Sequence, residues 1–144
     1  MKGLKTLTAI ALGIALLASA APAAAKGAAF RHYVACGLSE KAKPSHICQK
    51  PRKKGAFFRS NRGHPCTDTN GNQIRCVYYT VCVKFPTKKN LCAPKQQAEK
   101  GTLYVNKITS NIPGKHKVTW FVGGKRVGVF YLFVPERSHR RHGK

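Results

Sequence analysis

The stretch KVTWFVGGKRVGVFYLFV, residues 117–134, decides the fold class, because two apolar runs flank a pair of glycines. Five of its residues are aromatic, and after the first lysine its only charges, Lys125 and Arg126, lie beside the glycines. β-Branched and aromatic residues on both sides of a short glycine turn are typical of a β-hairpin. We therefore expect two antiparallel strands that reverse at Gly123-Gly124-Lys125-Arg126.

The register of this hairpin is open between two alternatives. If Gly124-Lys125 occupy the centre of the turn, Trp120 lies opposite Val129. A one-residue bulge instead places Trp120 on the same face as Phe130, Leu132 and Val134. Both registers leave bulky apolar groups on both faces, so we expect a central place in the sheet packing, with core residues Val118, Trp120 and Val122. An exposed aromatic binding face is the alternative interpretation.

A second strong strand signal lies upstream, in CVYYTVCVKF, residues 76–85. Its residues alternate with a period of two, which predicts Val77, Tyr79 and Val81 on one face and Tyr78 and Lys84 on the other. Shorter strands are expected in GAFFRS (55–60) and GTLYVNKIT (101–109). Beyond the first residues of the chain no long segment has a helical period. With the hairpin this makes five strands, and the predicted fold class is all-β.

The first 25 residues have the pattern of a secretory signal peptide. Two lysines precede an apolar run, residues 7–17, that is too short to span a bilayer, and small residues follow. We expect cleavage after Ala25, with Ala20 as the alternative, and no transmembrane segment after cleavage. The protein is therefore expected to be secreted, either extracellular or associated with the cell envelope. We expect residues 26–134 to form a single disulfide-bonded β domain with a loop-rich N-terminal part and a hairpin core at 77–134, and residues 135–144 to form a disordered basic tail.

The chain contains six cysteines, an even number that suits a disulfide framework in a small exported domain. Cys76 and Cys82 lie six residues apart on one predicted strand, about 20 Å at ~3.3 Å per residue, so they cannot pair with each other. Cys66 and Cys76 become directly opposed if Asn70-Gly71-Asn72 is a three-residue hairpin loop. We therefore expect the bonds 66–76, 82–92 and, by elimination, 36–48, so that Cys36, Cys48, Cys66, Cys76, Cys82 and Cys92 are all oxidised.

Residues 77–134 resemble a known group of proteins. The segments VYYTVCVKFP, LCAPKQQAEKGTLYVNKI and GKHKVTWFVGGKRVG are similar to those of small secreted immunoglobulin-like β-sandwich proteins of actinobacteria, most of them uncharacterised. Their typical ending is V-T-W-x-V, a glycine turn and V-G or V-A, which Val118-Thr119-Trp120, Val122, Gly123-Gly124 and Val127-Gly128 match. The resemblance implies a β-sandwich and carries no catalytic residues across. Antibody domains place a Trp between two widely spaced core cysteines, whereas Trp120 follows every cysteine, so their inter-sheet disulfide is not implied.

The charge is strongly positive. The full chain has a formal charge of +23, and removal of residues 1–25, which contain two lysines and no acid, leaves 119 residues with +21. Clustered cations release counterions from a phosphate- or carboxylate-rich partner, so we expect acidic polymers of the cell envelope or nucleic acid as partners. A merely soluble, positive surface is the alternative. The candidate binding residues are Lys50, Arg52, Lys53, Lys54, Lys88, Lys89, Lys115, Lys117, Lys125 and Arg126, and those from residue 88 onward are expected to gather at one end of the sandwich.

Catalytic and metal-binding patterns are weak in this sequence. Four scattered acids do not suit paired-carboxylate chemistry, and the nucleophile elbow G-x-S-x-G is absent. The best enzyme hypothesis is a small basic ribonuclease that uses His32, His64 or His116. Neither C-x-x-C nor H-x-x-x-H occurs, and the loop DTNGNQ offers one carboxylate, so we expect no metal and no cofactor. The predicted function is a secreted non-catalytic binding or cell-surface module, with a ribonuclease-like hydrolase or a cationic antimicrobial effector as alternatives.

Overall fold

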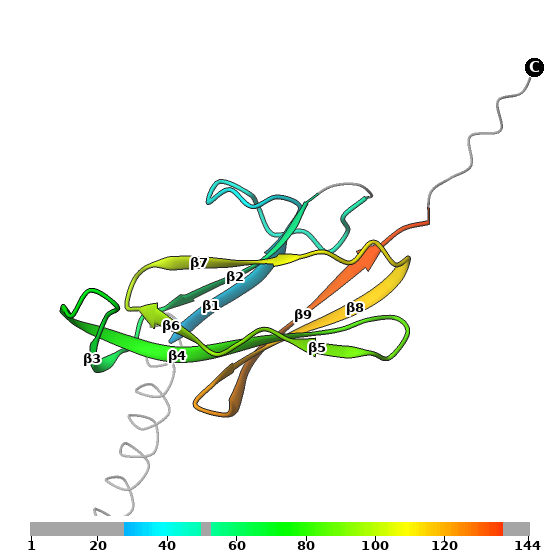
Figure 1. Cartoon of the computed structure of the whole chain (residues 1–144). Coiled ribbons are helices and arrows are strands. Elements are labelled where there is room, and N and C mark those ends of the chain that lie inside the picture. The colour runs from blue at the N-terminus through cyan, green and yellow to red at the C-terminus, as the bar shows by residue number, and fades with distance from the viewer. Residues whose placement is uncertain (1–27, 50–52, 137–144) are drawn as a thin grey trace, which may run out of the picture.

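The computed structural model describes residues 28–49 and 53–136 (Figure 1). Three predicted features lie outside the described residues: the predicted signal peptide, the candidate residues Lys50 and Arg52, and residues 137–144 of the predicted tail. Within them the chain forms nine strands: β1 (Phe30–Ala35), β2 (Lys54–Ser60), β3 (His64–Thr67), β4 (Gln73–Lys84), β5 (Asn90–Cys92), β6 (Gln96–Glu99), β7 (Leu103–Ile108), β8 (Gly114–Val122) and β9 (Lys125–Val134). The all-β prediction is confirmed.

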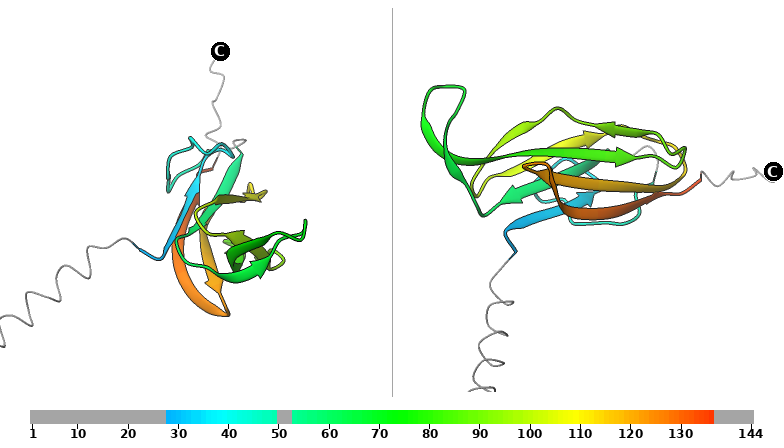
Figure 2. Two further views of the ribbon diagram at one scale, coloured as in Figure 1. Left: turned by 90° about the vertical axis from the view of Figure 1, so that its left-hand side faces the viewer. Right: turned by 90° about the horizontal axis from the view of Figure 1, so that it is seen from below.

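The strands form two antiparallel sheets, which Figures 1 and 2 show from three directions. Side chains from both sheets form one core. Sheet A has the order β1-β2-β7, and sheet B contains β3-β4-β8-β9 with β5 and β6 also paired to β4. The core joins the sheets directly, since the rings of Phe58 in β2 and Tyr79 in β4 stack with centroids 4.3 Å apart. Val118 and Trp120 are fully buried in this core, as predicted, and Val122 packs half-buried at its margin.

The hairpin β8–β9 adopts the bulged register. The bulge lies between Trp120 and Phe121, Trp120 pairs with Gly128, and the side chains of Leu132 and Val134 are buried on the same side as Trp120. The turn is centred on Gly123 and Gly124, whose φ values of 58° and 79° suit a type I′ turn, and not on Gly124-Lys125.

Gly128 fits the observed register because no side chain could be accommodated at this position. The ring of His32 in β1 lies against Gly128, and a Cβ at position 128 would be 2.5 Å from three ring atoms. The same ring lies 5.2 Å from the Trp120 ring, centroid to centroid. The absence of a side chain at position 128 therefore allows sheet A to approach the hairpin closely.

The N-terminal part is more regular than the sequence predicted, and the expectation of five strands is wrong. β1 pairs with β2 along its whole length, and β3 pairs with the first residues of β4. On the face of sheet A away from the main core, Tyr33 stacks on Phe57 at 4.9 Å, and Ala42 of the following segment packs against this second cluster. The sequence of β1 does not alternate between apolar and polar residues, because both faces of the strand are covered. For this reason β1 was not predicted as a strand.

The three disulfides join the pairs that the spacing predicted, 36–48, 66–76 and 82–92, with Cα atoms 5.4, 6.1 and 4.0 Å apart. Cys82 lies directly opposite Cys92, but Cys66 lies opposite Ile74, so the bond to Cys76 runs diagonally between β3 and β4. The expected three-residue loop is therefore wrong. The loop is longer because the Asp68 carboxylate accepts hydrogen bonds from the backbone N–H groups of Asn70 and Asn72.

Candidate functional site

The outer face of sheet B, which points away from the core, carries both lysines and exposed aromatic side chains. Alternation along β4 buries Val77, Tyr79 and Val81 and turns Tyr78 and Lys84 outward, as predicted. The outward residues of β8 lie in register with them, and those of β9 continue the same rows across the sheet. We call this surface the outer face; the residues considered on it are Tyr78, Lys84, Lys88, Lys95, Lys115, Lys117, Phe121, Tyr131 and Phe133. The register also places Arg126, opposite Phe121, and Glu99, opposite Cys76, on this face.

Three lysines meet at one end of the outer face. Lys84 of β4 lies directly opposite Lys117 of β8, and both line a depression of about 320 Å³ together with Lys88. Lys88 is placed there by the turn after β4, where it adopts a left-handed φ of 68° and donates its N–H to the Phe85 carbonyl. The described residues that line the depression include no carboxylate. Like charges directly opposite each other destabilise a sheet, so these ammonium groups favour an anion between them.

A second depression continues the first along the sheet. Its volume is about 450 Å³, and its lining includes Tyr78, Lys95 and the turn glycines of the hairpin. Phe121 lines both depressions and therefore lies between them. From Lys84 to Tyr78 the distance is six residues of extended strand, about 20 Å at ~3.3 Å per residue. The two depressions together form a linear track that suits an extended polymer.

Exposed aromatic side chains gather on the same face. Tyr78, Tyr131 and Phe133 are 47%, 44% and 46% exposed. A lysine ammonium group lies over each of two of these rings. The Nζ of Lys115 lies 4.3 Å from the Tyr131 ring centroid, and the Nζ of Lys95 lies 5.7 Å from the Tyr78 ring centroid. Aromatic and cationic groups are thus interleaved, a combination that recognises negatively charged partners with flat groups.

The predicted basic residues divide into separate groups. Lys88, Lys115 and Lys117 lie at one end of the outer face, and Lys89 follows Lys88 in the same turn. The expectation that Lys125 and Arg126 join them is wrong, because these two follow the hairpin turn at the opposite end of β8 (Figure 1). Lys53 is exposed beside β2.

Lys54 requires a different correction. Its side chain is only 1% exposed, and its Nζ donates a hydrogen bond to the Asn111 side-chain oxygen at 3.0 Å. A lysine held in this way is not available to a polymer at the surface, so we remove it from the candidate set. Sequence reasoning also missed Lys84 and Lys95; the alternation of β4 placed Lys84 on the outer face but did not show its neighbours.

The three histidines of the ribonuclease hypothesis have separate neighbours. His32 packs against Trp120, and His64 is exposed in β3, opposite Cys76. His116 is fully buried; its Nε2 lies 2.7 Å from the Ser110 hydroxyl, and burial lowers the pKa of its imidazole. A serine beside a histidine is also the pattern of a nucleophile with its base. Because both side chains are buried, this pair fixes the loop before β8 and offers no access to a substrate.

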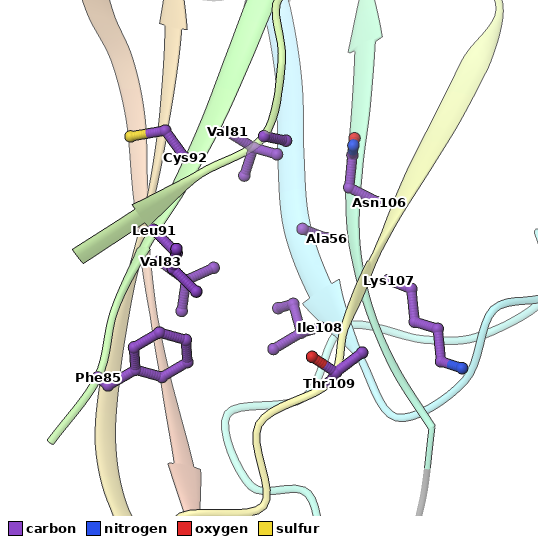
Figure 3. Close-up of a pocket in the computed structure, with 11 residues that line it drawn as sticks. Ala56, Val81, Val83, Phe85, Leu91, Cys92, Asn106, Lys107, Ile108 and Thr109 are labelled. Atoms are coloured by element: carbon purple, nitrogen blue, oxygen red, sulfur yellow. The ribbon is translucent and has the colours of Figure 1, made fainter. Parts of the chain in front are cut away.

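A separate apolar pocket of about 260 Å³ opens between the β4–β5 hairpin and β7 (Figure 3). Val81, Val83, Phe85 and Ile108 line it, and the Lys107 side chain points away from it. Within the described residues no group of three or more histidine, cysteine or acidic side chains is arranged to hold a metal ion. The outer face is therefore the better candidate for a functional site.

Comparison with known proteins adds no assignment: no protein-family model matches the chain, and a search of curated proteins gives no match.

Proposed function

We propose that the protein is a secreted, non-catalytic module that binds acidic polymers on the outer face of sheet B. The observation that carries this proposal is the opposition of Lys84 and Lys117, with Lys88 in the same depression. Without a partner this arrangement costs stability, and an anionic group between the lysines offsets that cost. A linear acidic polymer would gain further contacts along the 20 Å track, since ~20 Å spans several charges of a typical polyanion.

Two features support export. The predicted signal peptide would direct the chain out of the cytoplasm, and three disulfides within the described residues are typical of proteins in oxidising compartments. In the part of the chain that the structure describes, no helix has the length and apolar character needed to cross a membrane. A basic exported module would meet the acidic polymers of the cell envelope first.

We also propose an immunoglobulin-like arrangement for the sandwich. The pairing orders β1-β2-β7 and β4-β8-β9 support it, because they follow the A-B-E and C-F-G orders of immunoglobulin sheets. The disulfides differ: each of the three joins segments close in sequence, and Trp120 lies on β8, the strand that would correspond to F.

The test is a titration of labelled heparin at several salt concentrations. The double variant Lys84→Gln/Lys117→Gln should bind about tenfold more weakly than the wild type at about 50 mM NaCl, with a shallower salt dependence, because two charge contacts are lost. The matched control is Lys53→Gln/Lys107→Gln, which removes the same charge from the exposed residues beside β2 and on β7 of sheet A and should bind within about twofold of the wild type. Equal losses in both variants would mean that net charge alone determines binding.

A further inference from the structure

The aromatic residues of the outer face are exposed in a pattern that solubility does not explain. Three aromatic side chains in the described residues are exposed by more than 40%, and all three, Tyr78, Tyr131 and Phe133, lie on the outer face. An exposed group of large apolar side chains is typical of an interaction surface. The lysines would explain affinity for any polyanion, but they do not explain why three aromatic side chains are exposed on the same face.

The rings and the lysines form a ladder across β8 and β9. Lys117 lies opposite Tyr131 and Lys115 lies opposite Phe133, so two successive rungs each pair one lysine with one aromatic residue. The Lys115 side chain runs diagonally, so that its ammonium group lies over the Tyr131 ring. The rungs are two residues apart, about 7 Å along the strands. The couple of Lys95 and Tyr78 presents the same two groups on the second depression.

Such a repeat matches a polymer in which each unit carries one negative charge and one flat ring. Single-stranded nucleic acid has this composition, with one phosphate and one base per nucleotide. In complexes with single strands, bases stack on aromatic side chains while cations follow the backbone. Aliphatic polyphosphates and acidic polysaccharides supply the charge without an aromatic face, and a duplex keeps its bases stacked inside.

We infer that the acidic polymer bound on the outer face is single-stranded nucleic acid, with bases stacked on Tyr131, Phe133 and Tyr78 and phosphates paired with the adjacent lysines. This inference rests on the proposed function, since the lysines of the same face supply the charge. Sequence preference is expected to be small, because every base has a face that can stack.

The test compares three labelled probes by fluorescence anisotropy: oligo-dT of about fifteen nucleotides, its duplex with oligo-dA, and heparin. The variant Tyr131→Leu/Phe133→Leu keeps apolar side chains but removes both rings. It should weaken oligo-dT binding about 25-fold or more, since each stacked base contributes about fivefold or more, while heparin binding changes less than about twofold. Tyr131→Phe, which retains the ring, is the matched control and should bind oligo-dT like the wild type.

The results distinguish a failure of this inference from a failure of the proposed function. If the ring-free variant binds oligo-dT as tightly as the wild type, or loses heparin equally, the inference fails and the broader proposal of polyanion binding stands. If the wild type binds heparin or the duplex but not oligo-dT, the partner is another polyanion. If it binds none of the probes at low salt, the proposed function itself fails. If the β9 variant does not fold, the variants Tyr78→Leu and Tyr78→Phe allow the same comparison on β4.

Discussion

Removing one of the two opposed lysines should stabilise the fold while it weakens binding. Lys84 and Lys117 are directly opposite each other on neighbouring strands, so their Cβ atoms are about 5 Å apart and their like charges destabilise the sheet. Cross-strand pairs contribute about 0.2–1 kcal/mol, and Lys84→Gln should therefore raise the free energy of unfolding by about 0.5 kcal/mol. For a domain of this size that corresponds to an increase in melting temperature of about 2 °C.

The assay is differential scanning fluorimetry at low and high salt. At about 1 M NaCl the Debye length falls to about 3 Å, so the gain should disappear as the repulsion is screened. Lys125→Gln is the control, because Lys125 lies opposite Val122 and not opposite another cation. A Lys84→Gln variant that is less stable than the wild type, or one whose gain persists unchanged at high salt, would refute the reasoning.

Four further predictions concern the fold. Trp120→Ala should cost about 3–5 kcal/mol, because the indole is fully buried, and wild-type Trp fluorescence should resist quenching by iodide. Gly128→Ala should cost about 1–3 kcal/mol through the clash with the His32 ring, measured by denaturant unfolding. Burial lowers the pKa of His32 and His116 below 6.5, so the unfolded state binds more protons and stability should fall as pH drops below about 6.5; His116→Gln should flatten that pH dependence. Reduction of all three disulfides should lower the melting temperature markedly, since each native bond in a small domain contributes about 2–5 kcal/mol; an unchanged melt after verified reduction would contradict this.

Strands β4, β8 and β9 of sheet B could be predicted from the sequence because their signals are local, whereas β3, β5 and β6 were not predicted. Alternation placed Val77, Tyr79 and Val81 inward, and cysteine spacing together with strand geometry gave the three disulfide pairs. The glycine turn and the bulged register were also among the predicted alternatives. What selected the register was a tertiary contact, the close approach of His32 to Gly128, which no local pattern contains.

The candidate site was predicted only in part, because contacts between distant segments of the chain also determine which lysines are exposed together. The basic clusters indicated a polyanion partner, but Lys54 is buried against Asn111, and Lys125 lies at the far end of the hairpin. Both outcomes depend on strand pairing between distant segments. The exposure of Tyr131 and Phe133 could not be predicted either, because both faces of the hairpin are apolar in sequence and only the packing of sheet A decides which face is covered.

The most direct test of the account is to map which lysines a bound polyanion protects. The oxidised protein would be acetylated at its lysines with and without heparin, and the modified sites would be quantified by mass spectrometry. The account predicts protection of Lys84, Lys88, Lys95 and Lys117, while Lys107 on β7 of sheet A reacts as it does in the free protein. Protection centred on Lys107, or uniform protection of all surface lysines, would contradict a binding site on the outer face.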